Sequence, residues 1–584
     1  MSAESASEVE QTTTAGSQWP YVPPQRSSRT WSRPNWLRPN WLRWALAVFS
    51  VLVPAGLFAW HASMYGSWEI DDAGITFAYA RSVADGFGPV LQPGQPPVEG
   101  FSDPAWLALL VVGRWLGLFD HGTWFGVPDY VAYPKTLATL LVTGAFAAFH
   151  AAASALSRRP ALVTLLGGSI AAAIPSFVIW CVSGLENSLL VFAVVTSAAV
   201  MVRAQARGAL ATWQPAVVCG LLAALAALTR PEGPIYAAAY PLAVLLVSRR
   251  GVVAAIVSMA VSVVAFAVPA GAYLAWRVST FGELLPTTAV AKSQGLPTAA
   301  GFAKVTELVG YAGWLGVLVG VVLVGVALAG PARDGIVVVL VPLALALTAF
   351  GVLVPDWMEQ YRFAAPAWAL GSFVVALAAV EVVGGLRWRG RVVVGVVGTV
   401  AIVLSVIGWD GAMREFRANP TAPMCLIVVN SAFEFNAYLQ ALGRTSGTLF
   451  APELGGTALV GTSIVTDGGG LAEPVMARFW REKDTAGIRD YVLEQVRPTF
   501  LKAHGEFRPF MGFDADPRFQ ADYVEIAPTP NKGANWVRRD ALTDEGALDR
   551  LRVAAAAALA ADAAQRATPT ASCGDTLTPG ATHP

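Results

Sequence analysis

Two neighbouring carboxylates stand directly after the first long apolar run of the chain. They are Asp71 and Asp72, and they follow Glu69 and Ile70. Adjacent carboxylates at a membrane boundary lose hydration and repel each other, and both effects raise the pKa of one of them. A raised pKa suits a general base or a cation site. The pair therefore indicates chemistry here, with a merely acidic, solvated loop as the alternative.

Two further carboxylates, Glu186 and Glu232, also lie next to apolar segments. An ionisable group at such a boundary is a functional candidate because burying it without a partner is costly. We predict that both contact substrate. The alternatives are an Arg230–Glu232 pair that stabilises a turn, and a helix N-terminal position for Glu186, where the helix dipole favours a carboxylate.

Isolated basic residues at these boundaries could bind a phosphate group. Lys292 follows a Pro-Thr-Thr turn, and Arg81 ends a predicted short helix. Lys292 could instead extend to ordinary lipid headgroups, and Arg81 could instead pair with Asp85 or with headgroups.

A third candidate phosphate ligand, Arg362, is surrounded by aromatic residues. Trp357 and Tyr361 precede it, and their rings could stack on sugar faces. An aromatic belt at the membrane interface would explain the same two residues.

Composition requires that most of this chain be embedded in lipid. Of its 584 residues, 55% are hydrophobic and only 14% charged, and the mean hydropathy is +0.52. A membrane helix needs about 20 apolar residues, and about eleven runs qualify. They are 44–62, 136–156, 160–181, 187–203, 213–228, 234–248, 251–276, 309–330, 335–354, 366–385 and 392–409. A twelfth run, 104–119, is short and contains Arg114, which predicts an interfacial or re-entrant helix.

Positive charges predict the orientation of these helices, because cytoplasmic loops retain Lys and Arg. With residues 1–43 as a disordered cytoplasmic leader, five short basic loops fall on the leader's side. Their arginines are Arg158, Arg159, Arg203, Arg207, Arg249, Arg250, Arg333, Arg387, Arg389 and Arg391. The candidate site residues then face outward from the plasma membrane, at the outer end of a catalytic membrane domain at 44–409.

The composition changes again from residue 410, where polar residues return. Short β-type runs at 426–429 and 459–465 and helical patterns at 474–482, 486–496 and 544–566 predict an extracytoplasmic α/β domain at 410–584. Cys425 and Cys573 could form a disulfide in an oxidising compartment, although their spacing leaves this open.

Several chemistries lack their usual sequence signals. No phosphate-binding glycine loop, dinucleotide fingerprint or Ser/His/Asp arrangement is found, and Cys-x-x-Cys pairs and His-rich clusters are absent. Nothing indicates nucleic-acid binding or a structural zinc site. The pattern favours a donor already activated on a lipid carrier. Carboxylates and phosphate are also ligands for Mg²⁺ or Mn²⁺, so a divalent cation stays open but is not required.

Several local motifs together resemble those of a known enzyme family. They are Asp71-Asp72, Val98-Glu99-Gly100-Phe101-Ser102, Ser183-Gly184-Leu185-Glu186, Thr229-Arg230-Pro231-Glu232-Gly233, Phe281-Gly282-Glu283-Leu284-Leu285-Pro286, Ala291-Lys292-Ser293, Tyr361-Arg362-Phe363, Val465-Thr466-Asp467-Gly468, Gly470-Leu471 and Ala477-Arg478. Over roughly residues 40–500 they resemble polyprenyl-phosphate-dependent membrane glycosyltransferases of the GT-C fold. Within that family the chain is most similar to the mycobacterial terminal β-(1→2)-arabinofuranosyltransferases. It departs from them at Gly74, where a bulkier residue is expected, and at Asp103, where relatives often have Asn.

The resemblance implies a decaprenyl-phosphoryl-arabinose donor, a cell-wall arabinan acceptor and release of decaprenyl phosphate. Asp71 or Asp72 would deprotonate the acceptor hydroxyl, and Lys292, Arg230 and Arg362 would hold the donor phosphate. Glu99 would join the substrate-binding residues, and residues 410–584 would bind or support the glycan.

Other functions remain open alternatives. The enzyme could transfer another lipid-linked sugar such as mannose. A transporter or flippase for lipid-linked sugars predicts internal repeats and ionisable residues near the bilayer midplane, whereas here such residues gather at one face. A non-catalytic envelope protein would bind glycan through residues 410–584 alone.

Overall fold

The computed structural model describes residues 40–292, 299–354 and 357–567. The predicted leader lies outside this part up to residue 39, as does Cys573. All contacts discussed below lie within one compact unit, residues 46–584.

Seven of the described helices are long and apolar enough to cross a membrane, and up to nine spans result if each of two bent helix pairs counts as one. The long helices are α1 (Asn40–Ser63), α4 (Asp129–Leu156), α7 (Asn187–Ala206), α10 (Val252–Phe281), α14 (Arg333–Val352), α15 (Ala365–Gly385) and α16 (Trp388–Ala418). The bent pairs are α5 (Pro160–Ala173) with α6 (Pro175–Cys181), and α12 (Ala299–Ala312) with α13 (Trp314–Ala327). The chain therefore has the composition and helix lengths of a multi-pass membrane protein.

All eleven predicted apolar runs are helical, but four of them are not simple spans. The run at 160–181 bends by 79° before Pro175, and the run at 309–330 bends by 99° at Gly313, whose φ is +94°. The runs at 213–228 and 234–248 form α8 (Trp213–Ala227) and the pair η2 (Gly233–Ala238) and α9 (Ala239–Val247). α8 is only about 22 Å long at 1.5 Å per residue. η2 together with α9 is about 26 Å long, because the 3₁₀ turns of η2 rise about 2.0 Å per residue.

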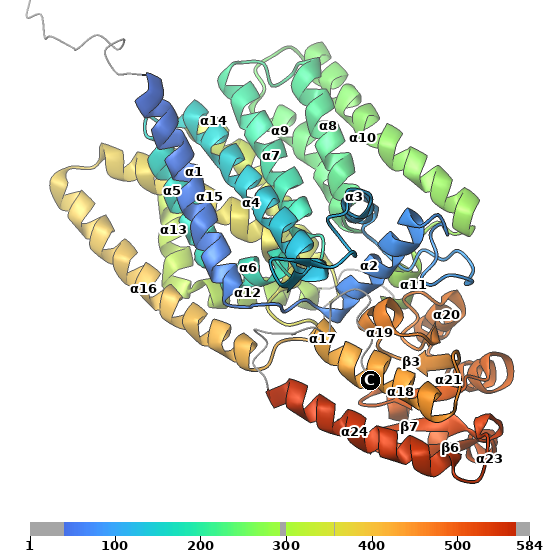
Figure 1. Cartoon of the computed structure of the whole chain (residues 1–584). Helices are drawn as coiled ribbons and strands as arrows, with labels where there is room; N and C mark the ends of the chain where they lie inside the picture. Colours follow the sequence, from blue (N-terminus) through green and yellow to red (C-terminus); the bar gives the residue numbers. More distant parts are fainter. Residues whose placement is uncertain (1–39, 293–298, 355–356, 568–584) are drawn as a thin grey trace, which may run out of the picture. The chain divides into compact units, whose positions relative to one another are not determined.

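A long loop after α1 contains two short helices that position the candidate site. These are α2 (Asp71–Ala84) and α3 (Pro104–Trp115), and a two-stranded hairpin of β1 (Thr123–Trp124) and β2 (Val127–Pro128) follows them. α3 has 12 residues, too few to span a bilayer, which agrees with the predicted interfacial or re-entrant helix. Figure 1 shows α2 close to α19 (Gly455–Val460) of the C-terminal part, and the two helices are in contact.

The C-terminal part contains the predicted sheet. Its strand order is β4-β3-β5-β7-β6. The strands are β3 (Thr448–Ala451), β4 (Ile464–Asp467), β5 (Phe500–Ala503), β6 (Tyr523–Thr529) and β7 (Gly533–Arg538). β3 pairs in parallel with β4 and β5, whereas β7 pairs antiparallel with β5 and β6.

Helices cover both faces of this sheet, so alternate strand residues enter two separate apolar cores. Leu449 and Phe500 pack with one helical layer, while their neighbours Phe450 and Leu501 pack with the other. The first layer is α18 (Glu434–Ala441) and α24 (Ala547–Ala567), and the second includes α20 (Pro474–Glu482), α21 (Thr485–Asp490), the π-helical turn η5 (Tyr491–Val496), α22 (Phe507–Met511), η6 (Phe513–Ala515) and α23 (Pro517–Asp522). The strands β5 and β7 are buried on both faces, apart from Arg538 at the end of β7.

The predicted helices of this part are confirmed, whereas the two predicted strands are largely wrong. The run at 459–465 begins within α19, and only its last two residues belong to a strand, β4. The helical pattern at 474–482 coincides with α20, and the Ala-rich run forms α24. The predicted strand at 426–429 is instead helical, in α17 (Met424–Ile427) and the π-helical turn η4 (Val428–Phe433). Its β-branched residues favour a strand locally, but they pack against α19 as a helix.

Candidate active site

The first turn of α2 is held by backbone contacts to two distant segments. Ile70 N–H donates to the carbonyl of Ser183 over 3.1 Å, and Asp71 N–H donates to the carbonyl of Ala422 over 2.9 Å. The two aspartates thus occupy the N-terminal turn of a fixed helix, where the helix dipole favours negative charge.

The Asp71 carboxylate is turned into the C-terminal part of the chain. It is 5% exposed and accepts hydrogen bonds from the N–H groups of Gly455 (3.1 Å) and Gly456 (2.7 Å). Burial raises the pKa of Asp71 to about 7, against the opposing effect of the Gly456 N–H and with further raising by Asp72 and Glu453. Asp71 therefore joins α2 to α19.

Asp72 faces a different side of the same helix. It is half-buried, and within the described residues no hydrogen bond or ion pair to its carboxylate is found. Thr76 lies four residues later, on the same helix face, and its hydroxyl donates to Asp103 at 3.2 Å. Asp103 is buried and lies beside Glu186 and Arg230. The face of α2 that carries Asp72 thus leads to the Arg230 cluster.

Arg230 is the centre of a buried charged cluster and is only 4% exposed. Its guanidinium donates to the carboxylates of Glu186 and Glu232 and, over 3.2 Å, to Asn187 Oδ1. Burial and the nearby Glu186 raise the pKa of Asp103 well above its ordinary value. Arg230 is therefore balanced by two carboxylates, while Asp103 is held toward its protonated form.

A second arginine lies beside this cluster. The guanidinium carbons of Arg230 and Arg362 are 4.8 Å and 4.9 Å from the centre of the same Phe363 ring. Asn187 Nδ2 donates to the carbonyl of Arg362 over 2.8 Å, which fixes the backbone of that loop. Two guanidinium groups therefore lie against one ring, and the Arg230 group is also paired with Glu186 and Glu232.

Glu99 has a different environment from the one predicted for a substrate ligand. It is buried and accepts hydrogen bonds from Arg277 Nε (2.5 Å), Arg277 Nη2 (3.0 Å) and the Tyr273 hydroxyl (2.6 Å). The backbone carbonyl of Glu99 also accepts from Thr287 N–H, which begins α11 (Thr287–Lys292). Glu99 therefore ties the long loop to α10 and to the segment that carries Lys292.

The remaining predicted residues lie nearer the surface. Lys292 is exposed at the end of α11. Trp357 is 60% exposed, and Tyr361 is half-buried with a left-handed φ of +55°. The Tyr361 ring packs edge-on against Tyr311. Trp357 is thus the predicted aromatic residue most open to a sugar.

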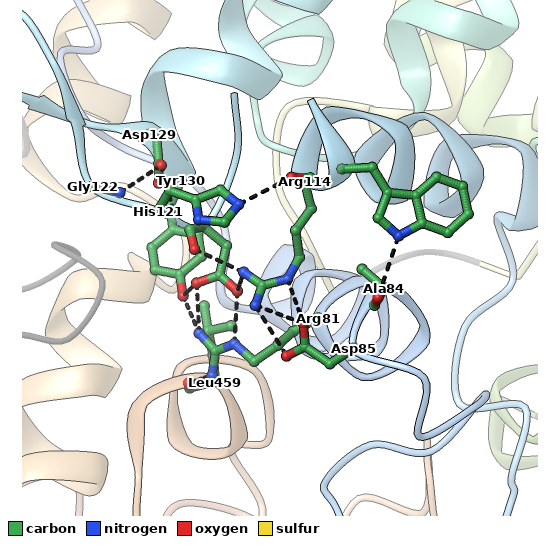
Figure 2. A network of polar contacts seen from close by, with 11 residues as sticks. Arg81, Ala84, Asp85, Arg114, His121, Gly122, Asp129, Tyr130 and Leu459 are labelled. Carbon is green, nitrogen blue, oxygen red and sulfur yellow. Dashed lines mark hydrogen bonds and ion pairs between the residues drawn. The ribbon is translucent and has the colours of Figure 1, made fainter. Parts of the chain in front are cut away.

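Arg81 forms part of a separate network of polar contacts, shown in Figure 2. It pairs with both oxygens of Asp120 (2.8 and 2.9 Å) and donates to the Leu459 carbonyl over 2.7 Å. Arg114 binds Asp120 from the other side and also pairs with Asp85. The predicted Arg81–Asp85 pair is therefore replaced by one with Asp120, and Arg81 connects the long loop to α19.

Two contributors to this region, Thr76 and Arg277, carry no motif that singles them out in sequence. Thr76 reaches Asp103 across 27 positions, and Arg277 directly follows the apolar run at 251–276. Only the position of an ionisable residue at the end of such a run could have drawn attention to Arg277. Among the described residues, no group of three or more His, Cys, Asp or Glu side chains is placed to hold a metal ion.

Comparisons with known proteins identify the fold but no closer relative. No family model and no curated protein sequence matches the chain. Among solved structures, ArnT from Cupriavidus metallidurans, bound to undecaprenyl phosphate, matches with a TM-score of 0.54 and 12% identity over 87% of this chain and 99% of its own. The oligosaccharyltransferase AglB from Archaeoglobus fulgidus, in complex with an inhibitory peptide and a dolichol-phosphate, matches with a TM-score of 0.52 and 11% identity over 85% of this chain and 75% of its own. The chain therefore has the helical membrane architecture of the GT-C fold, followed by a sheet-containing C-terminal part.

Proposed function

We propose that this protein is a membrane glycosyltransferase that transfers a sugar from a polyprenyl-phosphate carrier to a glycan acceptor on the extracytoplasmic face. The observation that carries the proposal is the position of Asp72. Its half-buried carboxylate shares a helix face with Thr76, which contacts Asp103 at the edge of the Arg230 cluster. A base and an anion-binding pair on neighbouring elements are the parts that such a transfer needs.

In this mechanism Asp72 accepts the proton of the attacking acceptor hydroxyl. The acceptor oxygen bonds to the anomeric carbon of the sugar, and the bond between that carbon and the phosphate oxygen breaks. Polyprenyl phosphate leaves with the electron pair of the broken bond. Arg230 and Arg362 stabilise the charge on the departing phosphate, with Lys292 as a third cation.

The two carboxylates of the pair have different roles in this proposal. Asp71 holds α19 against α2 through the N–H groups of Gly455 and Gly456, so we assign it as a positioning residue. Glu186 and Glu232 fix Arg230, and exposed Trp357 offers a stacking surface for the acceptor.

We propose arabinofuranose, carried on decaprenyl phosphate, as the sugar and cell-wall arabinan as the acceptor, from the motif resemblance to the mycobacterial arabinofuranosyltransferase B. Mannose on the same carrier is the second candidate. Solved structures of the same fold with undecaprenyl phosphate or a dolichol-phosphate support a lipid-phosphate donor. A transporter is disfavoured because the Arg230 cluster lies at the ends of α7 and α8 rather than in their middle.

The test is transfer by the purified full-length protein from synthetic polyprenyl-phosphoryl-arabinose to a short arabinan acceptor, with the mannose donor in parallel. We expect transfer of arabinose and inhibition by free polyprenyl phosphate. Arg362→Gln should weaken that inhibition by about tenfold, since a hydrogen bond to a charged group contributes about 1.5–3 kcal/mol. The matched control Arg552→Gln, at an exposed position of α24, should leave it unchanged. Folded wild-type protein that transfers neither sugar would contradict the proposal.

A further inference from the structure

A cavity of about 370 Å³ lies far from the candidate active site. It is lined by Gln205, Gly208, Leu210, Val247, Ser248, Arg249, Arg250 and Asp334. α7 connects the two places, because Asn187 at its start contacts Arg230 while Gln205 lies near its end. Eighteen helical residues at 1.5 Å each separate them by about 27 Å, close to the thickness of a bilayer's hydrocarbon core.

Two short apolar segments end beside the cavity. Leu210 lies just before α8, and Val247 ends α9. α8 is about 8 Å shorter than the usual hydrocarbon thickness of about 30 Å, and η2 together with α9 is about 4 Å shorter. The bilayer must therefore thin locally, or its headgroups must enter the recess.

The walls of the cavity are fixed by contacts between two loops and the helices α9 and α14. The Tyr240 hydroxyl donates to the Leu210 carbonyl over 2.6 Å, and Arg250 Nε donates to the Gly208 carbonyl over 2.9 Å. Arg249 Nη2 lies 3.1 Å from Asp334 Oδ2. The recess is therefore built from packed elements.

The chemistry of the lining favours an anion attached to an apolar group. Arg249 is 88% exposed as a side chain and uses one N–H group on Asp334, so further donors of its guanidinium face the recess or the solvent. Arg250 and Ser248 add donors beside it, and Leu210 and Val247 supply apolar wall. Basic pockets between membrane helices bind the phosphates of lipid headgroups in this way.

We propose that this cavity binds the phosphate headgroup of an anionic phospholipid in the leaflet opposite the candidate active site. The headgroup phosphate contacts Arg249 and Arg250. The first carbons of the acyl chains, next to the glycerol, lie against Leu210 and Val247. The bound lipid fills the recess left by the short segments α8 and α9. This site is independent of the proposed glycosyl transfer.

The test measures binding of short-chain phosphatidylglycerol to the purified full-length protein by native mass spectrometry. The double variant Arg249→Gln/Arg250→Gln should bind it about tenfold more weakly, through loss of two charge-assisted contacts. Arg158→Gln/Arg159→Gln is the matched control, since it removes two adjacent arginines from the loop between α4 and α5, and it should bind as wild type does. Asp334→Asn should bind about threefold more tightly, because it removes the carboxylate that competes with the phosphate.

If both arginine double variants lost phosphatidylglycerol binding to the same extent, the proposal would be overturned. Such a result would indicate that surface charge alone attracts the lipid. Equal binding of zwitterionic phosphatidylcholine would also overturn it. Inorganic phosphate that binds as tightly as the lipid would show a site for free phosphate and would contradict the assignment to a lipid. Circular dichroism of every variant checks that lost binding does not reflect misfolding.

Discussion

At the scale of single residues, the structure separates two aspartates that are neighbours in sequence. Asp71 is buried against two backbone N–H groups, whereas Asp72 is half-buried on the face that leads to Thr76 and Asp103. The sequence predicts that one of the pair acts as a base but does not distinguish them, because the contacts of Asp71 come from Gly455 and Gly456, more than 380 positions away.

The raised pKa of Asp71 predicts a pH-dependent contribution to stability. Its folded-state pKa of about 7 lies above the ordinary value of 3.8, so the stabilising contribution of the protonated form is present below about pH 4 and lost as the pH rises through about 7. Asp71→Asn cannot titrate. The thermal unfolding midpoint of the wild type should therefore fall relative to that of Asp71→Asn as the pH is raised from about 5 to about 8.

The comparison with Asp71→Asn removes the effect of other carboxylates that titrate in the same range. Asp467 is one of them, since burial raises its pKa to about 6. If the unfolding midpoints of the two proteins changed in parallel over the whole pH range, Asp71 would have the same pKa in the folded protein as in the unfolded chain. That result would contradict the prediction.

At the scale of elements, the close packing of α2 on α19 depends on glycines. A Cβ atom on Gly455 would lie 1.7 Å from the Asp71 carbonyl oxygen, and one on Gly74 would lie 2.7 Å from the Gly455 carbonyl carbon. Gly74, which departs from the resembled pattern, is thus explained by this contact. The small residue allows two helices to approach until their backbones touch.

Gly455→Ala should separate α19 from α2 and strongly reduce transfer. The new methyl group overlaps backbone that cannot rotate away, so we expect a thermal unfolding midpoint several degrees lower, as overpacking costs about 1–3 kcal/mol. Gly411→Ala is the control, because a Cβ atom there meets nothing within 4 Å. Unchanged stability and transfer in Gly455→Ala would show that this contact does not position the site.

The ion pairs around Asp120 predict that Asp120 and Asp85 contribute unequally to the stability of the fold. Asp120 is buried and binds Arg81, Arg114 and the Tyr130 hydroxyl, whereas the Asp85 side chain is 37% exposed. Breaking a buried ion pair costs about 3–5 kcal/mol, while an exposed pair contributes about 0–1 kcal/mol. Asp120→Asn should therefore lower the thermal unfolding midpoint much more than Asp85→Asn, and similar shifts would contradict a structural role for this network.

At the scale of the whole molecule, the sequence predicts the helices better than the spans. Among the described residues, an apolar run marks each candidate membrane span, because lipid exposure is a local property of composition. Whether a run crosses the bilayer also depends on breaks such as the bend before Pro175 and the short turn of η2, and these lower the count from about eleven to between seven and nine. In the C-terminal part, tertiary packing overrides the strand preference at 426–429.

The sequence predicts which residues form the candidate site better than it predicts which residues they contact. Ionisable residues at membrane boundaries mark Glu186, Arg230 and Glu232, and the structure joins all three. The partners of Glu99 and Arg81 depend on Arg277 and Asp120, which no local spacing connects to them. Cys425 is disulfide-bonded, while its predicted partner Cys573 lies outside the described residues.

The most direct test of the central claim is the turnover number for sugar transfer in Asp72→Asn and Asp71→Asn, measured at saturating donor. We predict that Asp72→Asn lowers turnover by about 10²- to 10⁴-fold, the usual contribution of a general base, without weakening inhibition by polyprenyl phosphate. Asp71→Asn should retain far more activity, because its amide oxygen can still accept from Gly456. Full turnover in Asp72→Asn together with complete loss in Asp71→Asn would contradict the assignment.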